Sequence, residues 1–215
     1  MRTALLAGAT GLVGSHLLRH LLSDDAWDRV LSIGRREVDL AHPKLEQRVV
    51  DFSALADLPA VDDTFSALGT TIKQAGSQQA FRAVDHDAVV ALATAAKQVG
   101  AASFLHVTAM GASPRSRVFY NRVKGETERD AAAAGIPRTV AFRPSILDGD
   151  RAESRRGEQV GLVVMRALAP VLGRYRPTHA EDVALAMLQV AGSPDGAVVP
   201  PVVSAGEITR VARAR

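Results

Sequence analysis

The chain lacks cysteine, is poor in aromatic residues and contains no long apolar run. The absence of cysteine excludes disulfide bonds, thiol nucleophiles and cysteine metal sites. Aromatic residues make up 4% of the chain and the arginines are scattered, so we expect no nucleic-acid partner despite a net charge of +3. We also expect no membrane partner, because no run approaches a membrane span. Gly8 interrupts the apolar start before a signal-peptide core could form, which predicts a cytoplasmic protein.

The overall composition is that of a globular protein. Hydrophobic residues make up 47% of the chain and charged residues 23%. At 215 residues the chain is long enough to bury most of its apolar surface in one core. No internal repeat or low-complexity linker divides it. We therefore predict a single domain over residues 1–215, in which the irregular segment 147–177 lies on the substrate side.

Apolar runs that resemble strands alternate with longer helical patterns, which predicts a parallel sheet covered on both faces. The expected strands are residues 4–7, 30–33, 48–52, 64–68, 103–107, 139–142 and 198–203. The expected helices are residues 12–22, 79–98, 121–134, 157–169 and 180–191, and the spacing Thr178-x-x-Glu181 predicts a capping box at the start of the last one. The fold class is therefore α/β, a doubly wound Rossmann-type domain with a mostly parallel sheet of about seven strands.

A glycine-rich turn follows the first predicted strand. It reads Gly8-Ala9-Thr10-Gly11-Leu12-Val13-Gly14 and leads directly into the first predicted helix. The unpaired backbone N–H groups and the positive dipole end of such a helix can hold a pyrophosphate. The spacing is GxxGxxG rather than GxGxxG, and an ordinary helix start is the alternative. Its place after an N-terminal strand nevertheless favours dinucleotide binding.

Two arginines follow the second predicted strand, where an acidic residue would bind the 2′-hydroxyl of an unphosphorylated adenosine ribose. Arg35 and Arg36 stand there instead. A planar guanidinium can pair bidentately with a 2′-phosphate, so the cofactor is predicted to be NADP(H). The alternatives are that both arginines are solvated loop residues, or that Glu37 is the acidic residue that binds the 2′-hydroxyl.

Tyr120 and Lys124 lie four residues apart at the start of a predicted helix, so their side chains share one face. An ammonium group close to a phenol favours the phenolate, which suits the pair for proton transfer. Chance alone would produce such a pair at a frequency of about 4% in a chain with this few tyrosines and lysines.

Other catalytic constellations are weaker. His16 and His20 have i, i+4 spacing, but no carboxylate follows them in the HExxH manner, so we predict a polar helix face and no metal site. His106 falls inside a predicted buried strand, which favours a core histidine with its hydrogen bonds satisfied. No Gly-x-Ser-x-Gly is present, which excludes the nucleophile elbow of α/β-hydrolases.

The sequence resembles the short-chain dehydrogenase/reductase superfamily, in its atypical or extended branch, through the glycine turn, Tyr-x-x-x-Lys and Phe142-Arg143-Pro144. It is more closely similar to the Tat-interacting-protein-like oxidoreductases through three blocks: ALGTT at 67–71, FYNRVKGE at 119–126 and DRAESRRGE at 150–158. The block at 150–158 is either a surface loop with weak ion pairs or a lid or partner surface.

The resemblance implies a cofactor site. Its pyrophosphate would lie on Gly8, Thr10, Gly11, Leu12, Val13 and Gly14, its 2′-phosphate on Arg35 and Arg36, and its adenine between Asp51 and Phe52. Leu68, Gly69 and Thr70 would follow the cofactor toward the nicotinamide ribose, which Lys124 would bond, and Pro144 to Leu147 would face the carboxamide.

The resemblance also implies the chemistry. Tyr120 would protonate the carbonyl oxygen in ketone reduction, and Thr108 would hold that oxygen where the superfamily usually has a serine. If that serine aligns with Ala109 instead, the hydroxyl is missing and Ser113 is the only nearby substitute. We therefore predict an NADPH-binding oxidoreductase acting on a small carbonyl or alcohol substrate. The alternative is a non-catalytic NADPH sensor that binds a protein partner, and the superfamily makes a homodimer plausible.

Overall fold

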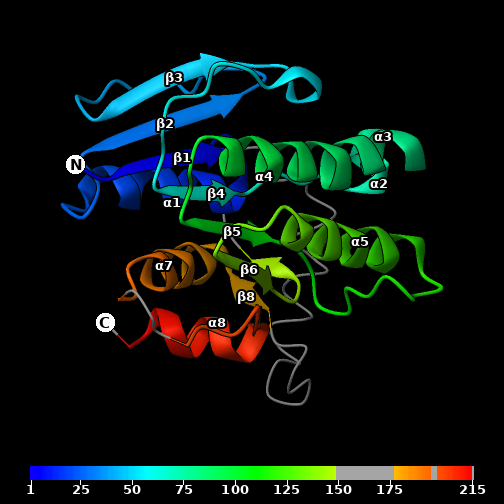
Figure 1. The fold of residues 1–215 in the computed structure, drawn as a ribbon. Helices are drawn as coiled ribbons and strands as arrows, with labels where there is room; N and C mark the ends of the chain where they lie inside the picture. The colour runs from blue at the N-terminus through cyan, green and yellow to red at the C-terminus, as the bar shows by residue number, and fades with distance from the viewer. Residues whose placement is uncertain (149–176, 195–197, 215) are drawn as a thin grey trace.

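Seven parallel strands form the central sheet of the computed structural model, which describes residues 1–148, 177–194 and 198–214 (Figure 1). The strand order is β3-β2-β1-β4-β5-β6-β9. The strands are β1 (Thr3–Ala7), β2 (Arg29–Gly34), β3 (Leu45–Val49), β4 (Asp63–Ser66), β5 (Ser103–Val107), β6 (Arg138–Arg143) and β9 (Val202–Ser204). The order reverses between β1 and β4, which is the doubly wound arrangement. The predicted fold class is confirmed.

Helices cover both faces of the sheet. On one face, α1 (Leu12–Ser23), α7 (Ala180–Ala191) and α8 (Ala205–Ala212) share a buried core with Ala4 and Leu6 of β1. On the other face, α4 (Ala88–Gln98) and α5 (Phe119–Ala133) pack over Leu5 and Ala7, and Figure 1 shows these two helices side by side. Successive residues of a strand point to opposite faces, so a strand buried on both sides needs a continuous apolar run.

The helix predicted over residues 79–98 is divided. Its first part is α3 (Gln78–Arg82), where the Ser77 hydroxyl accepts the Ala80 N–H, and α2 (Ile72–Ala75) precedes it. A π-helical turn, Ala83–Asp87, then joins α3 to α4. Such turns insert one extra residue into the helical hydrogen-bond pattern and are frequent at functional sites.

The structure corrects several predicted boundaries. The strand expected at 48–52 is β3, and Phe52 opens a 3₁₀ turn (Phe52–Ala54). The predicted capping box is wrong: His179 is the N-cap of α7, because Thr178 belongs to β8 (Thr178–His179), which pairs with β7 (Leu147–Asp148). The Thr178 hydroxyl instead accepts the N–H of Ser145. The predicted helix 157–169 and the block 150–158 lie outside the described residues.

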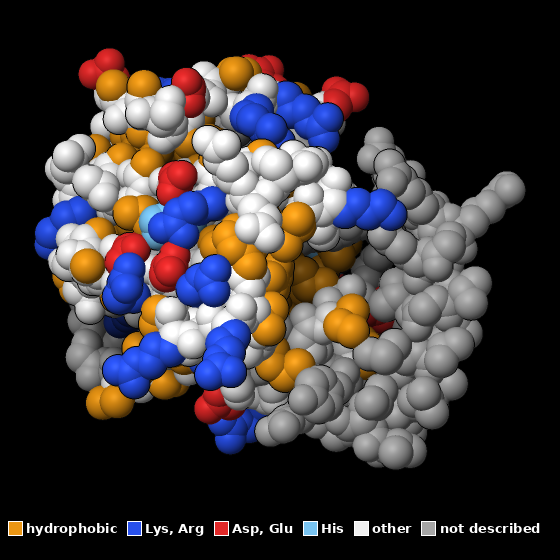
Figure 2. All heavy atoms as spheres, turned by 90° about the vertical axis from the view of Figure 1, so that its right-hand side faces the viewer, with side chains coloured by type: hydrophobic (Ala, Val, Ile, Leu, Met, Phe, Trp, Pro, Cys, Tyr) orange, Lys and Arg blue, Asp and Glu red, His pale blue; other side chains and the backbone are white. Residues whose placement is uncertain are grey.

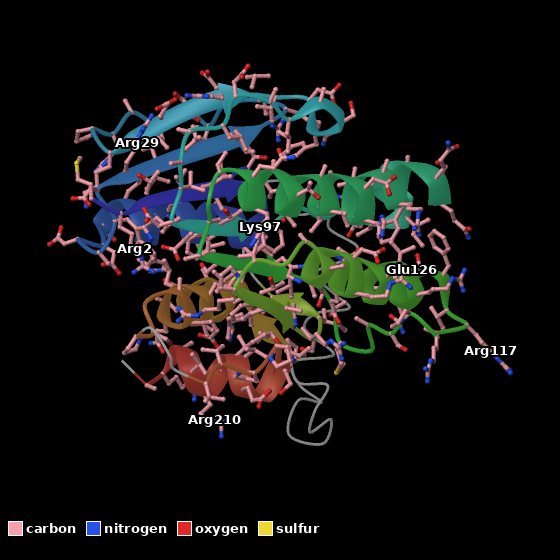
Figure 3. All side chains as sticks on the ribbon, in the orientation of Figure 1. Arg2, Arg29, Lys97, Arg117, Glu126 and Arg210 are labelled. Carbon is pink, nitrogen blue, oxygen red and sulfur yellow. The ribbon has the colours of Figure 1, made fainter. Side chains whose placement is uncertain are left out.

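A buried polar cluster connects the amino ends of β4 and β5 to the residues around them. Asp63 is 2% exposed and accepts hydrogen bonds from Arg2, from the Trp27 indole at 2.8 Å and from the Ser103 hydroxyl at 2.7 Å. Arg2, labelled in Figure 3, also donates to the backbone oxygen of Ala191 at the end of α7. Among the described residues, none of the helices is both long enough and apolar enough to span a bilayer.

Candidate cofactor and active site

A cavity of about 890 Å³ lies at the carboxyl ends of β1, β2 and β4. It therefore occupies the position where the strand order reverses, which is where open α/β sheets bind ligands. Figure 2 views this side of the molecule: one group of Lys and Arg side chains lies near the top, and others lie at the left and lower left of the face. The residues that line the cavity come from the ends of the first four strands and from the start of α4 with the turn before it: 8–11, 32–36, 49–53 and 67–69, with parts of 83–91.

The glycine turn fits a pyrophosphate because side chains are excluded from it. Gly8 has φ +91°, and a Cβ there would lie 2.7 Å from the backbone carbon of Ala67. A Cβ on Gly14 would lie 2.0 Å from the carbonyl oxygen of Gly8, so the close packing of α1 on the turn requires glycine. Gly11 is the N-cap of α1 and provides no side-chain cap. The start of α1 therefore offers backbone N–H groups to an anion at the cavity.

Arg35 and Arg36 both line the cavity and are exposed. Neither guanidinium forms a hydrogen bond or ion pair with another side chain in the part of the chain that the structure describes. Glu37 is exposed but is not among the lining residues. The two arginines are therefore available to an anionic ligand that reaches this end of the cavity.

Some of the predicted cofactor-binding residues line the cavity, and others do not. Thr10, Asp51, Phe52, Leu68 and Gly69 line the cavity together with Gly8 and Gly11. Val13 and Gly14 are buried in the packing of α1, and Leu12 packs against the same core. Pro144 and Leu147 are not among the lining residues: the Pro144 carbonyl accepts the N–H of Met110, and Leu147 packs against the core in β7.

Lys124 lies directly behind the cavity wall. Its Nζ atom is 2.7 Å from Oδ1 of Asp85, and both side chains are almost fully buried. A Cβ on Gly69, which lines the cavity, would be 3.8 Å from Lys124 Nζ and 3.5 Å from Asp85 Oδ1. Helix α5 thus directs an ammonium group toward the end of β4, and Gly69 is the residue that separates it from the cavity.

Asp85 belongs to the π-helical turn and is held from two sides. Its Oδ2 atom accepts the backbone N–H of Thr70 at 2.8 Å, and its own carbonyl oxygen accepts the Thr127 hydroxyl at 2.8 Å. Oδ1 is in ion-pair contact with Lys124 but accepts no well-aligned hydrogen bond from the described residues. Burial raises the pKa of the Asp85 carboxyl, and the charge of Lys124 and the Thr70 N–H offset only part of that effect.

Tyr120 lies one helical turn before Lys124, near the start of α5. The side chain is half-buried, and its ring centroid is 5.4 Å from that of Phe81 on α3. Phe119 contacts the same Phe81 ring at 6.0 Å. Tyr120 does not line the cavity, so the described cavity corresponds to the adenosine and pyrophosphate half of the predicted cofactor site.

Thr108 is placed differently from its predicted role. Its hydroxyl is buried and donates to Glu128 Oε1 at 2.6 Å, and it also lies 3.3 Å from the carbonyl oxygen of Phe142. Glu128 in turn accepts from Arg143. The hydroxyl therefore connects the end of β5 to α5, and Thr108 is not among the residues that line the cavity.

His106 also departs from the sequence prediction. It is 1% exposed, as expected for a core residue, but its Nδ1 atom has no hydrogen-bond partner among the described residues. Burial lowers the pKa of the imidazole to about 3, and the charge of Lys124 adds to the effect. His106 is therefore neutral at physiological pH.

The free energy of unfolding is expected to fall below neutral pH because of His106. In the unfolded chain His106 takes up a proton below about pH 6.5, whereas in the folded chain it does so only near pH 3. The contribution of the neutral imidazole to stability is therefore fully present above pH 6.5 and decreases as the pH falls below that value. We expect a loss of about 2 kcal/mol between pH 7 and pH 5. Urea unfolding at both pH values measures it. His106→Leu should flatten this dependence and His42→Gln should not; an unchanged slope in His106→Leu would contradict the assignment.

Asp85 and the wall formed by the π-helical turn were not predicted from the sequence. The turn contributes Ala83, Val84 and Asp87 to the cavity lining, with Ala88 and Ala91 following in α4. One signal was present: Asp85 falls on the apolar stripe formed by Phe81, Val89 and Leu92. A carboxylate in the buried stripe of a helix is uncommon unless it has a partner, so the pattern indicates a buried cation nearby.

Comparison with known proteins agrees with this geometry. Residues 8–194 match a family model described as NAD(P)H-binding. "Protein FMP52, mitochondrial" of Eremothecium gossypii is 35% identical over 210 residues, covering 94% of both chains. The Aspergillus niger protein of the same name is 34% identical over 184 residues, covering 81% of this chain and 77% of that one. These names contradict the expected cytoplasmic location, because the relatives are named as mitochondrial proteins.

Solved structures show the same fold at low sequence identity. MoeE5 in complex with UDP-glucose and NAD has a TM-score of 0.71 and 20% identity, covering 98% of this chain and 80% of that one. UDP-glucuronic acid 4-epimerase from Bacillus cereus in complex with NAD has a TM-score of 0.66 and 14% identity, covering 94% and 76%. The chain has the fold of NAD(P)-binding oxidoreductases and epimerases. Because the family model covers most of the chain, the protein belongs to the NAD(P)H-binding family.

Proposed function

We propose that this protein is an NADPH-dependent oxidoreductase that interconverts a small carbonyl compound and its alcohol. The observation that carries the proposal is the position of Lys124, whose ammonium lies against cavity-lining Gly69 and one helical turn from Tyr120. The proposed acid–base pair therefore lies next to a cavity that can hold the adenosine and pyrophosphate half of the cofactor. Arg35 and Arg36 line the cavity and have no side-chain partner among the described residues, which supports NADPH over NADH.

In the proposed reduction, the glycine turn, Arg35 and Arg36 would hold NADPH, which would supply the hydride for the carbonyl carbon. Tyr120 then donates its hydroxyl proton to the carbonyl oxygen, which completes the alcohol and leaves a phenolate. The positive charge of Lys124 stabilises that phenolate, and Asp85 holds the ammonium in place at 2.7 Å. Solvent returns the proton to Tyr120, so the residues are unchanged after one cycle. In the oxidation direction, Tyr120 accepts the proton.

Cofactor preference tests the arginine assignment. Arg35→Ala and Arg36→Ala are each expected to weaken NADPH binding by about 10- to 100-fold, because a charge-assisted pair with a phosphate contributes about 1.5–3 kcal/mol. NADH binding should change little. The measurement is a titration of the purified protein with each cofactor, following reduced-nicotinamide fluorescence and the melting temperature.

Arg210→Ala is the matched control, because this arginine lies on α8, away from the cavity, as Figure 3 shows. Tighter binding of NADPH than of NADH, lost in the two variants but kept in the control, would support the assignment. Equal affinity of the wild-type protein for both cofactors would refute the NADPH preference. Failure to bind either cofactor would refute the proposed function itself.

A second candidate function is a non-catalytic NADPH sensor that binds a protein partner. The placement of Thr108 favours it, because the hydroxyl expected to hold the substrate oxygen is directed at Glu128 instead. Ala109, which follows, has no hydroxyl to replace it. A sensor would bind NADPH with the same residues but would not depend on the Tyr120 hydroxyl, which separates the two functions experimentally.

A further inference from the structure

A histidine-rich cluster lies at the contact between α1 and α7, outside the cavity. His16 and His20 come from successive turns of α1, and Glu181 comes from the first turn of α7. Each residue can offer one ligand atom, and these atoms all lie within 4.8 Å of one another. His20 Nε2 is already 3.3 Å from Glu181 Oε1. The third residue is distant in the sequence, so the HExxH pattern could not reveal it.

The two helices hold the cluster in a defined geometry. Residues four apart on a helix lie one above the other, so the two imidazoles share one face of α1. Buried residues next to the cluster, Leu17 and Leu21 on α1 and Val183 on α7, belong to one apolar core. Because that core fixes α1 against α7, the cluster does not depend on a loop for its arrangement.

We propose that His16, His20 and Glu181 bind one divalent transition-metal ion, with water completing its coordination. Two imidazole nitrogens and one carboxylate oxygen form a donor set that suits zinc, cobalt and nickel. Calcium and magnesium are disfavoured, because they prefer oxygen ligands. The ion would join α1, which begins at the glycine turn, to α7. This proposal does not rest on the proposed oxidoreductase activity.

The charged residues around the cluster allow a cation to bind there with moderate affinity. Arg19 opposes a second cation, since its Nη2 atom lies 3.2 Å from His16 Nδ1. The Arg19 side chain is exposed and can turn to solvent, and Asp182 lies beside Glu181 in the first turn of α7.

Titration of the full, tag-free chain with ZnCl₂ and NiCl₂, followed by calorimetry and by the melting temperature, tests the site. We expect one ion per chain and a melting temperature that rises with metal concentration. Co²⁺ should give a visible absorption band that reports its coordination. His16→Gln and His20→Gln should each weaken binding at least tenfold, and Glu181→Gln should weaken it as well.

His42→Gln is the matched control, because His42 lies before β3 and outside the cluster. The metal-free melting temperatures of all variants should match that of the wild type, because the cluster is partly exposed to solvent. No saturable binding at one ion per chain would overturn the proposal. Binding that is unchanged in the His16→Gln/His20→Gln double variant would also overturn it.

Discussion

Tyr120→Phe is expected to lower kcat for carbonyl reduction by about 100- to 10,000-fold, the usual contribution of a positioned acid or base. NADPH affinity should stay within about twofold of the wild type, because Tyr120 does not line the cavity described at the strand ends. A panel of small ketones and aldehydes, followed by the loss of NADPH absorbance, measures the rate. Fluorescence titration of the same preparations measures the affinity.

Phe119→Leu is the matched control for this variant. Phe119 precedes Tyr120 and contacts the same Phe81 ring, but it carries no hydroxyl. It should therefore alter local packing without removing the proton donor, and kcat should fall far less. Equal losses in the two variants would assign the effect to packing. A wild-type protein that binds NADPH but reduces no member of the panel, with Tyr120→Phe indistinguishable from it, would favour the sensor.

The glycine turn and the central strands were predictable because their signals are local. Gly8, Gly11 and Gly14 are close in sequence, and a Cβ on Gly11 or Gly14 would meet the carbonyl oxygen of Gly8 within the same turn. Gly8 is required by its positive φ and by a contact with Ala67 after β4, which is distant in the sequence. The buried strands β1, β2 and β5 appear as largely apolar runs, interrupted only by Ser32 in β2 and by His106 in β5, because both of their faces pack against helices. The edge strand β3 is not an apolar run: none of its residues is buried, and its three central residues, Glu46, Gln47 and Arg48, are polar. Its boundaries were therefore misplaced.

The site was only partly predictable, because the contacts of Lys124 and Thr108 are with residues distant in the sequence. Lys124 is found from its spacing to Tyr120, but its partner Asp85 comes from a π-helical turn that no short motif marks. The role predicted for Thr108 relied on its position after β5, and that position alone could not reveal that Glu128 on α5 accepts its hydroxyl. Side-chain direction within a loop depends on the helix that packs against it.

Breaking the ion pair between Asp85 and Lys124 is expected to lower both the free energy of unfolding and kcat. Asp85→Asn keeps an oxygen that can accept the Thr70 N–H but removes the charge that faces Lys124. A buried ammonium left without its partner costs about 3–5 kcal/mol, so the free energy of unfolding should fall by that amount. The variant should also reduce kcat, because the ammonium is no longer held behind Gly69. Urea unfolding and the carbonyl assay measure the two effects separately.

The double variant Asp85→Asn/Lys124→Met distinguishes a stabilising pair from a positioning pair. Burial raises the pKa of Asp85 although Lys124 is adjacent, so the attraction does not fully offset the cost of removing the carboxylate from water. The double variant should therefore recover most of the stability that Asp85→Asn loses, while kcat stays low. Losses that simply add would contradict this account. Recovery of stability without activity would mean that the pair is maintained for the position of the ammonium beside the cavity.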